Sequence, residues 1–289
     1  MIQTILNLDF TLLAVYTFIL GACIGSFLNV VIYRLPKMLE AEWRADCLLF
    51  LEKKETSNSP PFNLITLRST CPSCQTKIKF YHNIPLLSFI FLKGRCAYCQ
   101  TKLSYRYPLI ELITAALSLF CFVFFGPTTS FLWSTLFIFA LITLTFIDLD
   151  TQYLPDNITL SLLWLGLIAA NFNTFISLSD ALYGVLAGYL SLWSVNKLFY
   201  LITKKVGMGN GDFKLFAALG AWLGWQLLLP TILIASFSGA IIGVLYLKFK
   251  HKDNDTPIPF GPYLCLGGFI TFFWGNPLLN WYLSSAQLI

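Results

Sequence analysis

The chain alternates between long apolar segments and short polar connections. About 20 consecutive apolar residues are needed for a helix to cross a bilayer. Eight segments approach that length, approximately 10–33, 108–126, 129–147, 158–177, 181–202, 213–229, 230–248 and 262–283. The boundary near Pro230 is the least marked, and the apolar patch 85–92 is too short to span. The pattern predicts an all-α polytopic membrane protein with about eight transmembrane helices.

Composition supports this interpretation. The 289 residues are 57% hydrophobic, 17% aromatic and 11% charged, which is far from the composition of a soluble domain. The first positive charge is Arg34, so the N-terminus lacks the basic region of a cleavable signal peptide. We expect the first span to remain as a membrane anchor.

The basic residues predict the orientation of the chain. Twelve of the 19 Lys and Arg residues lie between Arg34 and Arg106, and the others are Lys197, Lys204, Lys205, Lys214, Lys248, Lys250 and Lys252. If the loop after the first span is cytoplasmic, as the positive-inside rule requires, eight alternating spans place every cluster on the cytoplasmic side. Both termini are then outside. The net charge of +5 therefore reflects membrane topology, and we expect no nucleic-acid partner.

The segment 36–107 is expected to form a small cytoplasmic domain between the first span, 1–35, and a seven-helix membrane domain, 108–289. Its first part predicts an amphipathic helix near the membrane surface, with apolar residues at helical intervals. These are Leu39, Trp43, Cys47, Phe50 and Leu51. The sequence TSNSPPFN then breaks the helix.

An internal repeat follows, CPSCQTK at 71–77 and CAYCQTK at 96–102. Two CxxC pairs separated by 21 residues are typical of a zinc site with four cysteine ligands, here Cys71, Cys74, Cys96 and Cys99. Disulfides or idle thiols are the alternative, but thiols stay reduced in the cytoplasm. A four-cysteine shell leaves no position for water, so one structural zinc ion per chain is expected in a ribbon-like domain.

The remaining cysteines and the two histidines have no such spacing. Cys23, Cys47, Cys121 and Cys265 are expected to be small buried apolar residues. His82 and His251 have no partner visible in the sequence and are assigned no role.

Five aspartates lie near predicted span ends, where a carboxylate is costly unless it is paired or functional. Asp156 precedes an apolar run and resembles a helix N-cap, and Asp180 resembles an outer first-turn or cap residue. Asp150 fits a solvated loop or a helper of Asp148. Charge counting places Asp148 and Asp212 together at cytoplasmic span ends.

Asp212 follows the glycine-rich sequence GMGNG. Gly207, Gly209 and Gly211 allow close approach of another backbone or of a substrate. No strand precedes the loop, so a dinucleotide site is not predicted. The structural alternative is a flexible turn in which Asp212 caps a helix. Brought together, Asp148 and Asp212 could share a proton and act as base and acid in peptide hydrolysis.

These motifs together resemble the bacterial type IV prepilin peptidase family. The resemblance runs from residue 21 to about 268 through GACIGSFLNVVIYRLP, RSTCPSC, NIPLLSF, GRCAYC, RYPLIEL, FIDLDTQYLPD, GMGNGDFKLFAALGAWLG and IPFGPYLCLGG. It implies a polytopic aspartic endopeptidase of the inner membrane with Asp148 and Asp212 as catalytic residues. The implied substrates are type IV prepilins and type II secretion pseudopilins, cut after a glycine on the cytoplasmic side.

The resemblance also implies methylation of the new N-terminus with S-adenosylmethionine, for which no binding residues can be assigned. Gly21 and Gly25 have the spacing of close helix packing. Asn29 and Arg34 could instead meet substrate or cofactor.

Two alternatives to this function remain. One is a presenilin-like GxGD protease that cuts within an apolar helix. The other is a non-enzymatic zinc-bearing scaffold or a transporter, whose acids would be expected near the bilayer midplane.

Overall fold

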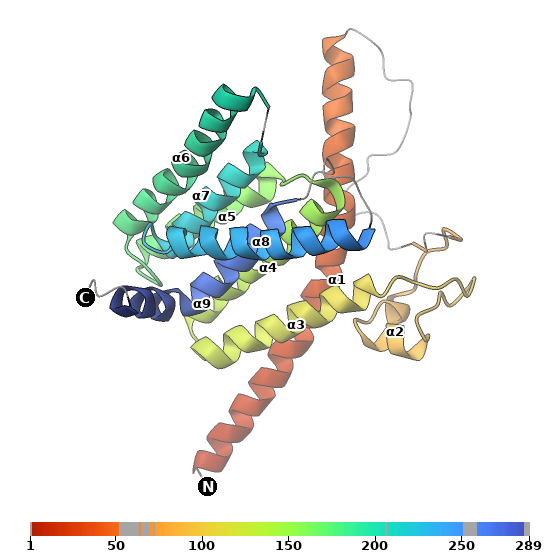
Figure 1. Ribbon diagram of the computed structural model, residues 1–289. Coiled ribbons are helices and arrows are strands. Elements are labelled where there is room, and N and C mark those ends of the chain that lie inside the picture. The colour runs from red at the N-terminus through yellow and green to blue at the C-terminus, as the bar shows by residue number, and fades with distance from the viewer. Residues whose placement is uncertain are drawn as a thin grey trace. The chain divides into compact units, whose positions relative to one another are not determined.

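The computed structural model describes residues 2–51, 64, 70–71, 73–205, 207–250 and 259–285. These residues form helices and no strand longer than an isolated bridge (Figure 1). The long helices are α1 (Ile2–Phe50), α3 (Arg106–Phe125), α4 (Thr129–Thr151), α5 (Asp156–Asn171), α6 (Leu178–Thr203), α7 (Asn210–Leu223), α8 (Leu228–Lys250) and α9 (Gly261–Ser285). The all-α fold is confirmed.

The eight predicted apolar segments correspond to these eight helices. Within the described residues, five are long and apolar enough to cross a membrane, at Asp9–Phe50, Arg106–Phe125, Thr129–Thr151, Leu178–Thr203 and Leu228–Leu245. Helices α5, α7 and α9 occupy the other three segments, and α7 has only 14 residues. The chain is a multi-pass membrane protein.

The break between the sixth and seventh segments differs from the prediction. Helix α7 ends at Leu223, where Gly224 has a φ of 76°, and α8 begins at Leu228. Left-handed glycine is a common helix terminator. Pro230 lies in the first turn of α8, where proline is tolerated because the missing N–H would have had no partner in the helix.

The chain divides into two compact units, Met1–Thr135 and Leu136–Ile289. In the first unit, α1 packs on α3 at Gly21 and Gly25. A Cβ atom on Gly21 would lie 2.9 Å from the Cα of Ala115, and one on Gly25 would lie 2.8 Å from the Cα of Glu111. The predicted packing role of these two glycines is confirmed.

Helix α1 is longer than predicted. The amphipathic segment is helical as far as Phe50, but it continues the first helix through Pro36 instead of forming a separate element. Proline within a helix removes one backbone hydrogen bond, but the loss of this bond at Pro36 does not end α1. Further along the first unit, the short α2 (Leu87–Phe91) and the 3₁₀ turn Phe80–His82 lie between the two cysteine pairs.

The second unit is built around α7, which is buried over most of its length. Its side chains Phe213, Leu215, Leu219 and Trp222 are all fully buried. Helix α6 approaches α7 so closely that a Cβ atom on Gly184 would collide with the backbone of Gly220. The indole of Trp222 donates a hydrogen bond to the Leu162 carbonyl of α5 at 2.8 Å.

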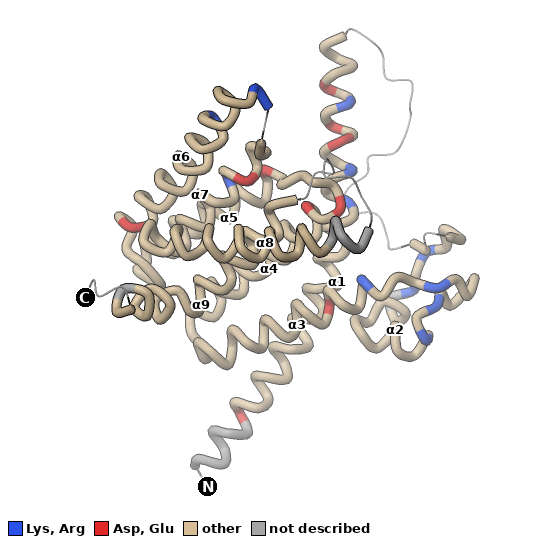
Figure 2. The backbone as a smooth tube through the Cα atoms, in the orientation of Figure 1, with Lys and Arg blue, Asp and Glu red and all other residues tan. Residues whose placement is uncertain are grey.

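Charged residues are confined to few places in each unit. Figure 2 shows Lys and Arg around the α2 segment of the first unit and at the C-terminal end of α6 in the second, while most of α3 and α4 is uncharged. The segments between the clusters are therefore apolar, as the positive-inside interpretation assumes.

Candidate active site and metal centre

Asp148 lies in the last turn of α4 and is 4% exposed. Its Oδ2 atom accepts a hydrogen bond of 3.0 Å from the backbone N–H of Gly261. Gly261 is the first residue of α9, and the first N–H groups of a helix have no partner within it. The Asp148 carboxylate therefore satisfies a free helix donor in a buried position.

Gly261 has no room for a side chain. A Cβ atom there would lie 2.6 Å from Asp148 Oδ2 and 3.2 Å from Leu154 Cδ1. The absence of a Cβ atom is thus what permits the close approach of α9 to Asp148.

Asp212 is the third residue of α7 and is 9% exposed. The N-cap position is occupied by Gly209, so Asp212 is not the N-cap residue that the structural alternative assumed. The carboxylates of Asp212 and Asp148 are close enough to interact electrostatically. The buried thiol of Cys265 on α9 also interacts electrostatically with both carboxylates. The structure therefore brings the two predicted aspartates together in a buried environment.

Leu154 connects the surroundings of the two acids. This buried residue follows α4 in the turn that leads to α5. A Cβ atom on Gly211 would lie 2.9 Å from the Cβ of Leu154, which also touches the Gly261 position. Gly211 is consequently required by packing beside Asp212.

The other two glycines of the loop have different surroundings. The backbone N–H groups of Gly207 and Met208 donate to Oδ1 of Asn196 at 3.3 and 3.1 Å. A Cβ atom on Gly209 would make only ordinary contact, 3.7 Å from Asp212 Oδ2. The loop is anchored to α6 through Asn196, and a role of its glycines in substrate binding stays a prediction.

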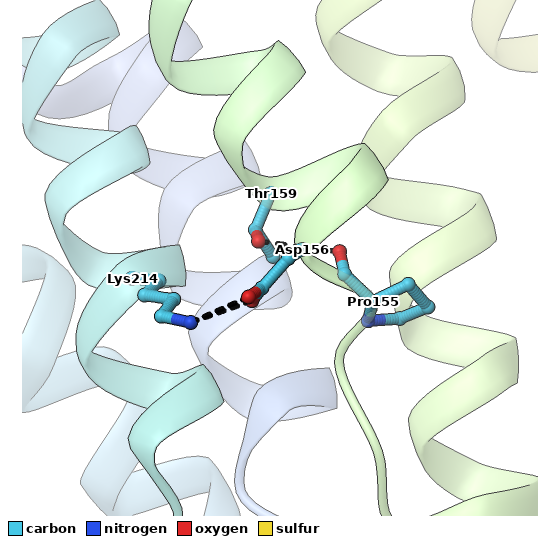
Figure 3. Close-up of polar contacts among 4 residues, drawn as sticks. All are labelled: Pro155, Asp156, Thr159 and Lys214. Carbon is cyan, nitrogen blue, oxygen red and sulfur yellow. Dashed lines mark hydrogen bonds and ion pairs between the residues drawn. The ribbon is translucent and has the colours of Figure 1, made fainter. Parts of the chain in front are cut away.

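Asp156 is not the N-cap that its sequence context predicted. Pro155 occupies that position, and Asp156 is the first helical residue of α5. Its carboxylate receives two hydrogen bonds from Lys214 Nζ, at 2.6 and 2.8 Å (Figure 3). This ion pair ties the start of α5 to α7, two residues beyond Asp212.

The remaining acids have separate roles. Asp150 is exposed at the end of α4. Asp180 lies in the first turn of α6, where its backbone N–H donates to Ser177 Oγ and its Oδ2 accepts from the same hydroxyl. The first-turn interpretation of Asp180 is confirmed.

The four cysteines of the repeat form one cluster. Their sulfur atoms all lie within 4.8 Å of one another, and Sγ of Cys71 is 3.7 Å from Sγ of Cys99. A tetrahedral zinc ion with Zn–S bonds of about 2.3 Å holds its sulfur ligands about 3.8 Å apart. The cluster can therefore hold a metal ion.

The repeat in sequence is also a repeat in structure. Cys71 N–H donates to Thr76 O at 3.1 Å, and Cys96 N–H donates to Thr101 O at 2.9 Å. An antiparallel bridge closes each turn, Thr70 with Lys77 and Arg95 with Lys102. Both turns thus present their thiols in the same way.

Hydrogen bonds lower the pKa values of two thiols of the cluster. The hydroxyl and backbone of Thr101 lower the pKa of Cys99 to about 6, and hydrogen bonding to Thr76 lowers the pKa of Cys74. Metals bind thiolates, so these hydrogen bonds favour metal binding.

The isolated cysteines divide into two pairs. Cys121 and Cys265 are buried as expected, but Cys23 and Cys47 are exposed on α1. The expectation of burial was wrong for these two because the helix face that carries each of them is not covered within the described residues. His251 lies outside the described residues.

Two residues that contact the aspartates, Gly261 and Lys214, were assigned no such contact from the sequence. Gly261 was visible only as part of IPFGPYL, where a Gly-Pro pair before an apolar run is a helix-start signal. Lys214 was counted as a topological charge. Neither contact is predictable from sequence spacing, because each partner is on a distant segment.

The combination of a multi-pass helical fold with a buried pair of carboxylates defines a class, the membrane aspartic peptidases. Two family descriptions match the chain, the Bacterial Peptidase A24 N-terminal domain over residues 19–125 and the Type IV leader peptidase family over residues 135–244. The protein belongs to the type IV leader peptidase family.

Curated relatives match almost the whole chain. Proteins named prepilin leader peptidase/N-methyltransferase are 49% identical in Legionella pneumophila, over 90% of this chain and 91% of the relative, and 48% identical in Pseudomonas aeruginosa, over 93% of both. The relative of that name in Aeromonas hydrophila is 48% identical, also over 93% of both chains. No solved structure matches the chain significantly.

Proposed function

We propose that the protein is a membrane aspartic endopeptidase that removes the basic leader of type IV prepilins and type II secretion pseudopilins. Cleavage follows a glycine on the cytoplasmic side, and the new N-terminus is then methylated. The observation that carries the proposal is the buried, interacting pair Asp148 and Asp212. The names of the relatives supply the substrate class and the second activity.

Two buried carboxyl groups that interact electrostatically cannot both ionise cheaply, so one of them is expected to hold a proton. The ionised group removes a proton from water, which attacks the scissile carbonyl carbon. The protonated group then protonates the leaving amine. These roles need no metal ion and no covalent intermediate.

Asp148 is the better assignment for the base. Its Oδ2 accepts the Gly261 N–H at the start of α9, and a donor stabilises a negatively charged acceptor. Asp212 also has a backbone hydrogen bond, to Gly209, but the charge of Asp148 opposes its ionisation. Asp212 then carries the proton. Gly261 is in this account a positioning residue that acts through Asp148.

The substrate is expected to approach along the glycine loop. Gly207, Gly209 and Gly211 precede or begin α7, next to Asp212. A narrow passage there would accept a substrate glycine before the cut more readily than a larger residue. We place the protein in the bacterial inner membrane among its lipids, with both termini periplasmic, the segment 36–107 cytoplasmic and the active site at the cytoplasmic face.

Two small components complete the proposal. Zinc held by Cys71, Cys74, Cys96 and Cys99 stabilises the fold of the segment that carries them, and it has no part in the peptidase chemistry. S-adenosylmethionine, when bound, supplies an electrophilic methyl group that the new amine takes with loss of a proton, leaving the thioether product.

The test is mass spectrometry of the N-terminus of a type IV pilin co-expressed with this protein. The proposal requires a pilin shortened by its leader and carrying one added methyl group. A full-length precursor would contradict the peptidase assignment. Cleavage inside the apolar helix of the precursor would instead identify a presenilin-like GxGD protease.

A further inference from the structure

A cavity of about 200 Å³ lies in the first unit, between α1, the segment around α2 and the start of α3. The polar residues that line it include Asn29, Arg34, His82 and Glu111. The aspartates lie in the second unit, and the four metal ligands are not among the lining residues. The cavity is therefore a separate candidate site.

Glu111 and Arg34 bring opposite charges to this one cavity. They are 9% and 8% exposed, so both charges are largely withdrawn from solvent. Burial of a charged group costs free energy unless a partner compensates the charge. A cavity lined by both signs is complementary to a ligand that itself carries both.

The backbone beside Glu111 is held in an unusual conformation. Leu86 has a φ of 60°, which is rare for a residue with a branched side chain, and its N–H donates to Oε2 of Glu111 at 2.8 Å. Such backbone strain collects at ligand sites, where surrounding contacts maintain it. Glu111 thus fixes the loop that forms one wall of the cavity.

His82 contributes an unsatisfied polar atom. Its Nδ1 is buried and has no hydrogen-bond partner within the described part of the chain. Buried polar atoms nearly always have partners, so this atom in the cavity wall is available to a polar group of a ligand. The rings of Tyr81 and Tyr98 contact His82 and fix its position.

The amide of Asn29 is already engaged on its donor side. Nδ2 donates to Gly25 O at 3.2 Å and to Tyr107 O at 3.1 Å, which ties α1 to the start of α3. These bonds orient the amide at the cavity. The aromatic residues Tyr33, Phe89 and Tyr107 also line the cavity, and aromatic faces attract cations.

We propose that this cavity binds the methionyl end of S-adenosylmethionine, with Glu111 facing its cationic groups and Arg34 its carboxylate. The inference rests on the proposed methyltransferase activity. Pockets for whole drug-sized ligands usually exceed about 300 Å³, so the smaller volume here suits the amino-acid end alone. His82 Nδ1 supplies a further polar contact.

The experiment measures binding of radiolabelled S-adenosylmethionine to the purified full-length protein by equilibrium dialysis. Glu111→Gln should weaken binding at least about tenfold, since one charge-assisted contact has that size. Glu42→Gln changes an exposed acid of α1 and serves as the matched control, with wild-type affinity expected. His82→Phe retains ring size, removes the polar atom, and should weaken binding severalfold.

Folding is checked in each variant by its zinc content and its cleavage of a pilin precursor. Unchanged affinity in both Glu111→Gln and His82→Phe would overturn the cavity assignment while leaving methylation by wild-type protein intact. Wild-type protein that cleaves but neither binds the donor nor methylates would instead refute the methyltransferase part of the proposed function, and with it this inference. If Glu111→Gln fails to fold, His82→Phe decides alone.

Discussion

The backbone N–H of Gly261 lies 3.0 Å from Oδ2 of Asp148, although 113 positions separate the two residues in the chain. This contact joins the start of α9 to the end of α4 at a buried carboxylate. It explains why a glycine is needed there, and it gives the first of five predictions.

Gly261→Ala should impair cleavage strongly, because its Cβ atom would lie 2.6 Å from Asp148 Oδ2. Displacement of a catalytic group by about 1 Å can cost on the order of 100-fold in rate. The measurement is kcat for a pilin precursor. Leu266→Ala, on the same helix but at an exposed position, should retain activity. Equal activity of the two variants would show that Asp148 tolerates the added carbon.

Asp148→Asn and Asp212→Asn should each abolish cleavage while the protein remains folded and inserted. Asparagine preserves size and polarity but cannot exchange a proton as a carboxyl group does. Asp180→Asn should stay active, because Asp180 serves the first turn of α6. The assay is conversion of precursor to mature pilin. Substantial conversion by either dyad variant would remove that residue from the mechanism.

The ion pair between Lys214 and Asp156 should stabilise the second unit modestly. Both side chains are partly exposed, at 31% and 46%, so solvent screening limits the pair to roughly 1 kcal/mol. A double-mutant cycle with Lys214→Gln and Asp156→Asn, followed by thermal unfolding, measures this coupling. We also expect slower cleavage, since α7 carries Asp212. A coupling energy near zero would show that the ion pair does not stabilise the packing of α5 against α7.

Purified protein should contain about one zinc ion per chain, because a four-thiolate shell holds a single ion. Cys71→Ser should lower zinc content and the stability of the first unit, as loss of one thiolate opens that shell. Cys23→Ser is the matched control, since Cys23 is exposed on α1 and outside the cluster. Full zinc content after replacement of all four cluster cysteines would locate the metal elsewhere. Partial peptidase activity should survive in the cluster variants.

A single cysteine at Thr203 should be protected from an impermeant maleimide in intact cells, whereas one at Thr128 should react at once. The charge pattern places the C-terminal end of α6 inside the cell and the connection before α4 outside. Both cysteines are placed in a protein in which Cys23 and Cys47 have been replaced. The same protein without the added cysteine gives the background of maleimide labelling. Labelling at Thr203 before the membrane is opened would put the Asp212 loop outside and refute the shared cytoplasmic face.

Much of the fold was predictable because its signals are local. Apolar length identified the eight helical segments, and the spacing of Gly21 and Gly25 indicated the packing of α1 on α3. The CQTK repeats predicted the four-cysteine cluster for the same reason, since each turn presents two thiols by its own hydrogen bonds. Errors fell at boundaries, where Pro36 did not end α1 and Gly224 ended α7 earlier than expected.

The sequence by itself determined the membrane class, the repeat and the choice of Asp148 and Asp212, because charge and hydropathy act at each position regardless of its neighbours in space. Only the tertiary structure decided which groups surround Asp148 and the neighbouring acid Asp156. Gly261 reaches Asp148 and Lys214 reaches Asp156 from distant segments. The cavity around Glu111 likewise depends on three separated segments, so no periodicity along the chain could reveal it. Such contacts depend on how the helices pack, and helix packing depends on side chains from all parts of the folded unit.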